Sequence, residues 1–335
     1  MIIAKAPLRI SFFGGGTDFP HYFERFEGKV ISTSFDKYVY ITVRHLPRYF
    51  SYKNQVVYAK VEQTDKPDQI EHPSVREAMK YLDMHNLRVV YDADIPARSG
   101  VGSSSAFAVA LLQAFYALKG KYISKQQLAK EAIYLERTLC KESGGWQDQI
   151  ASAFGGLNKI TFKNSEFSVE PIIISKERKE LLNKHLMLFF TGFTRISATL
   201  TDIQTKSIDS NISQLKEMYN LTDEAEKILT SKVDISEFGK LLHQSWLIKR
   251  SLTNKISNEN IDYLYNKALN CGAIGGKILG AGGGGFLLLF VAPELQQRLR
   301  EEFKDLIYVP FQFENNGAEI LYYYPEEYFL HKEQK

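Results

Sequence analysis

One segment constrains the fold more than any other: residues 92–115, DADIPARSGVGSSSAFAVALLQAF, join a strand to a long apolar helix through a turn rich in glycine and serine. Gly100 and Gly102 allow the backbone to bend tightly and to approach a ligand closely. The unpaired N–H groups and the positive end of the dipole at the start of a helix favour an anion. Serine hydroxyls bind phosphate oxygens or Mg²⁺, and three consecutive serines exceed what one helix cap requires. The segment therefore predicts a phosphate-binding loop, with an ordinary serine-capped turn as the alternative.

The composition is that of a folded protein with a balanced charge. The chain has 335 residues, and its 44% hydrophobic and 24% charged residues exclude a disordered, collagenous or fibrous protein. Cys140 and Cys271 cannot form a disulfide framework, which favours a reducing compartment. The net charge of +3 gives no reason to expect a nucleic-acid partner. No apolar run is long enough to span a membrane, and the N-terminus shows no secretory leader, so we expect a cytoplasmic protein without a membrane partner.

Several common nucleotide-binding signatures are absent from the sequence. It contains no G-x-x-x-x-G-K-[ST] motif of the P-loop NTPases and neither the H-R-D nor the D-F-G motif of protein kinases. A G-x-G-x-x-G pattern at Gly280, Gly282 and Gly285 opens a strand rather than a helix, which does not fit a dinucleotide fingerprint. We expect instead a loop whose backbone approaches a ligand or another loop, with a flexible hairpin connection as the alternative.

Hydrophobic patterning predicts a β-rich first half and a mixed second half. Strands are expected at 2–13, 30–45, 55–62, 87–95, 157–172 (a pair), 185–191, 286–292, 307–313 and 318–324. Helices are expected from Ser103 to Gly120, from Ser124 with a capping box, across most of 196–270, and after Pro293. No linker marks a boundary, and the change of pattern near 165–185 predicts domains at 1–175 and 176–335.

Three charged residues stand next to apolar positions. Arg9 lies within a strand that otherwise resembles core, where a cation is costly unless it is paired. Glu136 borders the apolar stripe of its helix, and Asp148 lies between two glycine pairs. A carboxylate that cannot face water needs a cation or a metal. The alternatives are an arginine that reaches solvent from an edge strand and two solvated surface acids. Arg195, which follows a buried strand, is either an anion clamp or a solvated loop residue.

Residues 5–19, 96–107 and 277–285, in this order, resemble three motifs of the GHMP small-molecule kinases, the superfamily that includes galactokinase and mevalonate kinase. The central family motif, P-x-x-x-G-L-G-S-S-[SA]-A, corresponds to Pro96–Ala106 with Val101 in place of leucine. The likeness is greatest to the heptose 7-phosphate kinases, which share PLRISFFGGGTDFP and a TG-x-[ST]-R stretch like Thr191–Arg195. The resemblance implies an α+β fold, with an N-terminal domain like the second domain of ribosomal protein S5 and a ferredoxin-like C-terminal domain.

The resemblance also implies ATP, Mg²⁺ and a set of site residues. Asp148 would be the general base, with Arg9 beside it, and Ser104 and Glu136 would hold the metal. The loop around the ATP phosphates would consist of Pro96, Arg98, Ser99, Gly100, Val101, Gly102, Ser103, Ser104 and Ser105. The sugar would contact Gly14, Gly15, Gly16, Thr17, Asp18 and Arg195. A supporting loop would contain Gly280, Gly282, Gly283 and Gly284.

A departure from the galactokinase pattern indicates the substrate. Gly15 and Gly16 replace a glutamate and a histidine that would close on the C6 end of galactose, whereas Asp18 is kept. The open turn suits a sugar that extends beyond C6 and carries a phosphate, which the turn and Arg195 would receive. The resemblance therefore implies phosphorylation of D-glycero-D-manno-heptose 7-phosphate at its anomeric hydroxyl, in the synthesis of nucleotide-activated heptose for surface polysaccharide. A kinase for a fucose- or galactose-like sugar and a non-catalytic sugar sensor remain the alternatives, and the sequence leaves open a monomer or a homodimer.

Overall fold

A large sheet forms the first part of the fold in the computed structural model, which describes residues 1–47, 49–97, 99–192 and 197–325. The β-branched and aromatic N-terminal sequence forms β1 (Ile2–Phe13) and β2 (Gly28–His45), which pair antiparallel. The described part of the sheet has nine strands. Six of them follow the order β13-β1-β2-β5-β3-β4, and the other three pair off this path. Its other described strands are β3 (Asn54–Val57), β4 (Val61–Thr64), β5 (Leu87–Ala93), β6 (Leu157–Lys163) and β7 (Glu166–Pro171), followed by β12 (Phe313–Glu314) and β13 (Glu319–Tyr323).

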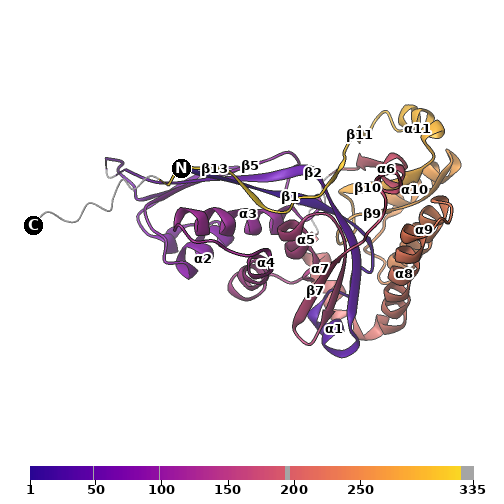
Figure 1. Cartoon of the computed structure of the whole chain (residues 1–335), viewed down its shortest axis with the longest axis horizontal. Helices are drawn as coiled ribbons and strands as arrows, with labels where there is room; N and C mark the ends of the chain where they lie inside the picture. The colour runs from indigo at the N-terminus through magenta and orange to yellow at the C-terminus, as the bar shows by residue number, and fades with distance from the viewer. Residues whose placement is uncertain (48, 98, 193–196, 326–335) are drawn as a thin grey trace, which may run out of the picture.

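Helices cover one face of this sheet (Figure 1). The central one, α3 (Ser103–Leu118), packs against β1 and β2. It is apolar on nearly every side, so it buries Leu111 and Phe115 completely, and each such side chain contributes about 1.5–3 kcal/mol. Around it lie α2 (Pro73–Tyr81), α4 (Lys125–Ile133), the π-helical segment η2 (Tyr134–Leu139) and α5 (Gln147–Phe154). The α+β class is confirmed.

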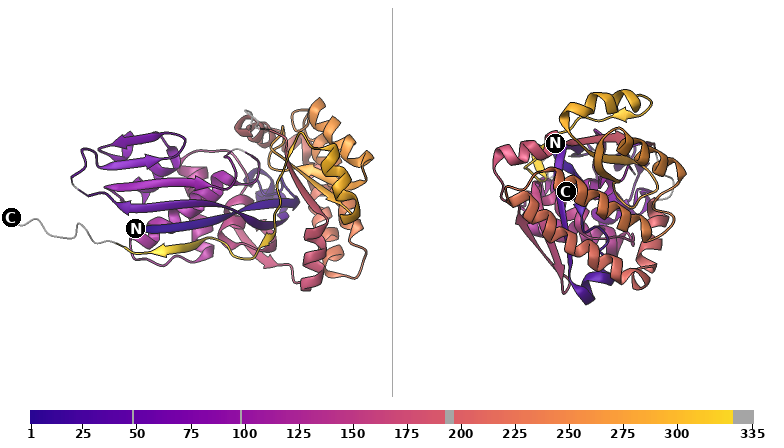
Figure 2. Two further views of the ribbon diagram at one scale, coloured as in Figure 1. Left: turned by 90° about the horizontal axis from the view of Figure 1, so that it is seen from above. Right: turned by 90° about the vertical axis from the view of Figure 1, so that its right-hand side faces the viewer.

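The second sheet has four antiparallel strands in the order β11-β8-β10-β9. These are β8 (Leu186–Phe190), β9 (Ala273–Ile278), β10 (Phe286–Val291) and β11 (Ile307–Tyr308). The helices of this half are α6 (Lys176–Lys184), α7 (Ser197–Lys206), α8 (Ile212–Thr230), α9 (Ser236–Ser251), α10 (Glu259–Asn270) and α11 (Gln296–Glu302). In Figure 2 this half stands at one end of the long first sheet.

The structure corrects four details of the predicted organisation. The predicted strand 55–62 is the hairpin β3–β4, and the predicted strand 307–313 contributes to both sheets as β11 and β12. Four short helices were not predicted, because each has few turns: α1 (Pro20–Phe26), α2, α5 and α6. Strands β12 and β13 return to the first sheet, where β13 covers the free edge of β1. Phe313 and Asn315 also form hydrogen bonds with Asn183 and Lys179 of α6. The division at 175 otherwise stays a prediction.

The two halves meet where β1 ends. Phe12 and Phe13 both pack edge-on against Phe238 of α9, at ring-centroid distances of 5.3 and 5.1 Å. Helix α8 contacts β1 and β2 at the same place. The end of β1 and the turn that follows it are therefore held against helices of the second half. No helix in the described ranges is long and apolar enough to cross a membrane.

Candidate active site

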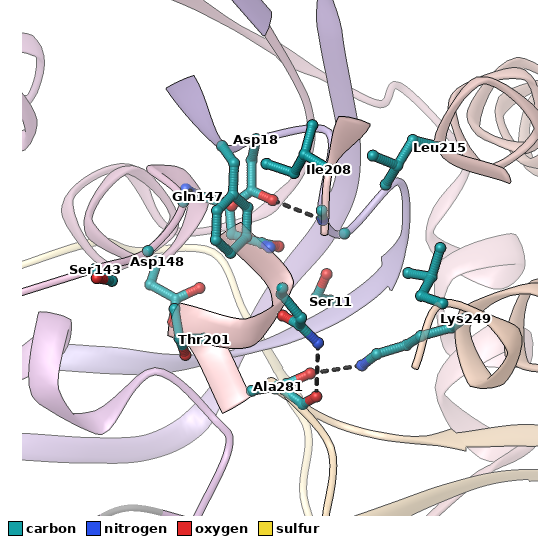
Figure 3. A pocket seen from close by; sticks show the side chains of 18 of the residues that line it. Ser11, Asp18, Ser143, Gln147, Asp148, Thr201, Ile208, Leu215, Lys249 and Ala281 are labelled. Atoms are coloured by element: carbon teal, nitrogen blue, oxygen red, sulfur yellow. Dashed lines mark hydrogen bonds between the residues drawn. The ribbon is translucent and has the colours of Figure 1, made fainter. Parts of the chain in front are cut away.

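A cavity lies at this junction, between the end of β1, the start of α5 and helices α7 to α9 (Figure 3). Residues from three distant parts of the sequence line it: Arg9 and Asp18, Asp148, and Lys249. The structure thus brings together three residues that the sequence singled out, with Lys249 added.

Arg9 and Asp148 form a two-point ion pair in the cavity wall. Arg9 Nε donates to Asp148 Oδ1 at 2.8 Å, and Arg9 Nη2 donates to Oδ2 at 2.7 Å. The Arg9 side chain is 4% exposed and that of Asp148 is 25% exposed, so Asp148 reaches the cavity while Arg9 lies behind it. Arg9 is therefore paired inside the strand, and the alternative of an arginine that extends to solvent is wrong.

The same arginine holds the predicted phosphate loop. Arg9 Nη1 donates to the Gly100 carbonyl at 2.7 Å, and the Arg9 backbone N–H donates to the Val101 carbonyl at 3.0 Å. Gly102, at the start of α3, has φ +79°, and a Cβ on it would lie 3.4 Å from Asp148 Oδ2. The carboxylate thus adjoins the N-terminus of α3, where free N–H groups favour an anion.

The glycine-rich segment 280–285 packs directly on this loop. A Cβ on Gly280 would lie 2.6 Å from the Cα of Gly100, and a Cβ on Gly285 would lie 2.4 Å from the carbonyl oxygen of Ser99. Both glycines have positive φ values, +70° and +94°. The prediction of a loop whose backbone approaches another loop is confirmed.

Glu136 lies behind the serines at the start of α3. It is 1% exposed and accepts hydrogen bonds from Ser104 Oγ at 3.0 Å and Ser105 Oγ at 2.7 Å, and from Gln149 Nε2. Within the described ranges it has no ion pair with a cationic side chain. A buried carboxylate beside an exposed serine hydroxyl supplies the hard oxygen atoms that Mg²⁺ prefers, so these residues fit a metal. The alternative of a solvated surface acid is wrong for Glu136.

The turn after β1 contributes Gly15, Gly16 and Asp18 to the cavity. Asp18 is 1% exposed and accepts hydrogen bonds from the backbone N–H of Gly16 at 2.9 Å and of Gln147 at 3.3 Å. Burial raises the pKa of Asp18, and the charge of Asp148 adds to this effect. The turn is thus held by its own aspartate.

Gly14 and Thr17 support the turn and are not among the residues that line the cavity. Thr17 is fully buried, and its Oγ1 donates to the carbonyl oxygens of Gly14 and Lys29 at 2.8 and 2.9 Å. A Cβ on Gly14 would lie 1.8 Å from the Lys29 carbonyl oxygen, which explains the glycine there. Arg98 and Arg195 lie outside the described residues.

Two buried lysines in the cavity wall were missed by the sequence analysis. Lys249 donates to the carbonyl oxygens of Ile278 and Gly280 at 3.2 and 2.5 Å, and Lys277 donates to that of Phe12 at 2.8 Å. Burial, with a contribution from the charge of Arg9, lowers the pKa of Lys249 to about 7 and that of Lys277 well below its usual value.

A sequence signal exists for one of them. Lys249 lies at helical spacing from Leu242, Ser245 and Trp246, on the face of α9 that is buried. A cation on a buried face needs a partner, so this spacing marks Lys249 as a candidate site residue. Lys277 follows two glycines and offers no comparable signal. Arg137 was also missed; its Nη2 donates to the Gly145 carbonyl at 2.9 Å and shapes the loop beside Asp18.

Comparisons with known proteins agree with this geometry. The family model for the GHMP kinases N terminal domain matches residues 73–156, and the model for the GHMP kinases C terminal domain matches residues 225–306. The D-glycero-alpha-D-manno-heptose 7-phosphate kinase of Campylobacter jejuni is 27% identical over 313 residues, which cover 89% of this chain and 91% of that one. A bifunctional fucokinase/GDP-fucose pyrophosphorylase of Arabidopsis thaliana is 29% identical over 66% of this chain and 22% of its own length.

Solved structures share the fold. A D-glycero-D-manno-heptose 1-phosphate kinase from Bacteroides thetaiotaomicron superposes with a TM-score of 0.80 and 23% identity, over 97% of this chain and 100% of that one. A Lactococcus lactis galactokinase in complex with galactose gives a TM-score of 0.73 and 16% identity, over 95% and 94% of the two chains.

Proposed function

We propose, from the premise that the chain belongs to the GHMP kinases, that it transfers the γ-phosphoryl group of ATP to the anomeric hydroxyl of D-glycero-D-manno-heptose 7-phosphate. The chain is a phosphotransferase with an alcohol group as acceptor. The products of the proposed reaction are the 1,7-bisphosphate and ADP. The product would enter the synthesis of nucleotide-activated heptose, and the protein would act in the cytoplasm.

The observation that carries the proposal is the Arg9–Asp148 pair at the N-terminus of α3. Asp148 accepts the proton of the sugar hydroxyl as the sugar oxygen bonds to the γ-phosphorus and the bond from this phosphorus to the bridging oxygen of ADP breaks. The guanidinium of Arg9 holds the Asp148 carboxylate through two hydrogen bonds, which fixes its orientation in the cavity wall. In this proposal, the backbone N–H groups at the start of α3 would stabilise the negative charge that develops on the transferred group.

The remaining predicted residues take their roles around this pair. The loop from Pro96 to Ser105 surrounds the ATP phosphates, and 280–285 supports it from behind. Ser104 and Glu136 would hold Mg²⁺, which when bound neutralises phosphate charge.

The sugar would occupy the cavity beside Asp18. This carboxyl group, held by the turn, accepts hydrogen bonds from ring hydroxyls. The open turn at Gly14 to Gly16, with Arg195, receives the C7 phosphate in this proposal.

A second candidate substrate is a fucose-like sugar, which the similarity to part of the bifunctional fucokinase/GDP-fucose pyrophosphorylase of Arabidopsis thaliana favours. The test is a panel of heptose 7-phosphate, unphosphorylated heptose, fucose and galactose, each with MgATP, with ADP release as the readout. We expect the highest kcat/KM with heptose 7-phosphate. A higher kcat/KM with fucose would replace the proposed substrate, and no release of ADP with any sugar would contradict a sugar kinase.

A further inference from the structure

We propose that Lys249, Lys277 and Ser11 form a binding site for a phosphoryl group in the wall of the cavity. The three residues come from α9, β9 and β1. The inference rests on the proposed function for the identity of the ligand, and it assigns to the reaction a group of residues outside the phosphate loop.

The first observation is the burial of two ammonium groups without a carboxylate partner. Lys277 is 2% exposed and Lys249 is 7% exposed, and both line the cavity. Their hydrogen-bond acceptors within the described ranges are backbone carbonyls, one for Lys277 and two for Lys249. An ammonium group has three N–H donors, so each lysine keeps at least one for a ligand.

The second observation is the charge balance of the cavity. Arg9 adds a third cation, whose charge disfavours the protonated form of both lysines. Asp148 already pairs with Arg9, and Asp18 is buried with a raised pKa. When both lysines are protonated, the described part of the cavity holds more cationic than anionic side chains, even with Asp18 ionised beside Lys249. An anionic ligand would stabilise this protonated state.

The third observation is an unused hydroxyl. Ser11 is 6% exposed, lines the cavity, and has no hydrogen-bond partner for its Oγ among the described residues. The next residue in the chain is Phe12, whose carbonyl accepts a hydrogen bond from the Lys277 ammonium group. Ser11 and the end of the Lys277 side chain therefore meet β1 at adjacent residues. Two ammonium groups and a hydroxyl supply the donors that a phosphoryl group requires.

The phosphoryl group has two possible sources. It is either the group in transfer from ATP or the phosphate that the sugar carries, which would then bind at the lysines rather than at the turn and Arg195. Lys249 contacts Gly280, which packs on Gly100 of the predicted phosphate loop, and this contact places the lysine close to that loop. In Figure 3 the Lys249 side chain points toward the segment at Ala281. Kinetic measurements separate the two sources.

The binding experiment uses inorganic phosphate as the probe, measured by calorimetry with saturating ADP so that the phosphate loop is filled. Lys249→Met and Lys277→Met should each weaken phosphate binding by about tenfold or more, because each removes a charged hydrogen-bond donor. Lys240→Met is the matched control, since Lys240 lies on the same helix with its side chain 64% exposed and paired with Glu237. Wild-type phosphate affinity in both cavity variants, with their folds intact by circular dichroism, would overturn the proposal.

A further variant keeps the test valid if a methionine variant does not fold. Ser11→Ala removes the unused hydroxyl without changing a charge, and it should weaken phosphate binding by about threefold to tenfold. Unchanged phosphate affinity in Ser11→Ala would remove Ser11 from the site. If both methionine variants fail to fold, the Ser11→Ala measurement decides, and unchanged phosphate affinity in that variant would overturn the proposal.

Turnover then identifies the source. If the sugar's phosphate is bound, Lys277→Met raises KM for heptose 7-phosphate about tenfold or more and lowers kcat/KM for unphosphorylated heptose by a much smaller factor. If the group in transfer is bound, kcat falls by a similar factor with both sugars. Unchanged kcat and KM in both lysine variants would overturn the proposal. If phosphate binding depends on the lysines but the protein phosphorylates neither heptose, the phosphoryl-binding site is supported and the proposed function is contradicted.

Discussion

Replacing Asp148 by asparagine should separate catalysis from nucleotide binding. The substitution keeps the size of the side chain and removes the charge that would accept the proton. General-base catalysis contributes about 10²- to 10⁴-fold, so kcat should fall by that factor, or by about 3–5 kcal/mol in activation free energy. The affinity for ADP should stay within about twofold of wild type, since no hydrogen bond of the phosphate loop is lost.

The stability cost of this substitution follows from the geometry of the pair. Arg9 is 4% exposed and would lose its charged partner, a change that costs about 3–5 kcal/mol for a fully buried pair. Asp148 is 25% exposed, and Arg9 keeps the Gly100 carbonyl as an acceptor, so we expect the free energy of unfolding to fall by about 1–3 kcal/mol. Denaturant unfolding followed by circular dichroism measures this loss.

Asp262→Asn provides the matched control for Asp148→Asn. It removes a carboxylate that pairs with Arg250 at 2.9 Å outside the cavity, and it should leave kcat unchanged. Single-turnover release of ADP is the assay. A folded Asp148→Asn enzyme with kcat within about threefold of wild type would refute the role of Asp148 as the base.

Three further predictions concern the phosphate loop, the metal and a buried lysine. Gly280→Ala should raise KM for ATP and lower the free energy of unfolding by about 1–3 kcal/mol, because the added Cβ would lie 2.6 Å from the loop backbone. Gly120 also has a positive φ, +64°, but has open space around it, so Gly120→Ala should lower the free energy of unfolding by about 1 kcal/mol and leave KM for ATP unchanged. Glu136→Gln should raise the Mg²⁺ concentration for half-maximal activity about tenfold or more, and an unchanged Mg²⁺ requirement would remove it from the metal site. The pKa of Lys249 is lowered to about 7 in the folded protein, below its value in the unfolded chain, so above pH 7 the unfolded state binds more protons than the folded state. In denaturant unfolding between pH 7 and 9, the free energy of unfolding of wild type should therefore rise by up to about 1.4 kcal/mol per pH unit relative to that of Lys249→Met. A difference between the two proteins that does not change with pH would contradict this.

Local patterns in the sequence predicted much of the fold. The apolar helix 103–118 and the strand 2–13 were predicted because their side chains are buried and their patterns are continuous. The predicted strand 307–313 was wrong in detail, since its ends pair with different sheets and nothing local encodes a change of partner. The hairpin 54–64 was missed because its strands have only four residues each.

The site was predicted in part, for a related reason. Arg9 and Asp148 could each be marked as unusual, but their pairing joins residues 139 positions apart and depends on tertiary packing. Lys277 was missed because its burial results from contact with the backbone of Phe12, which its own surroundings in the sequence do not reveal.

The position of the transferred phosphate tests the central claim most directly. Wild-type protein is incubated with MgATP and D-glycero-D-manno-heptose 7-phosphate, and the product is examined by phosphorus–proton correlation NMR. We expect one new phosphorus signal coupled to the anomeric proton, with one ADP formed for each bisphosphate. A phosphate on any other oxygen, or ADP formed without a sugar bisphosphate, would contradict the account.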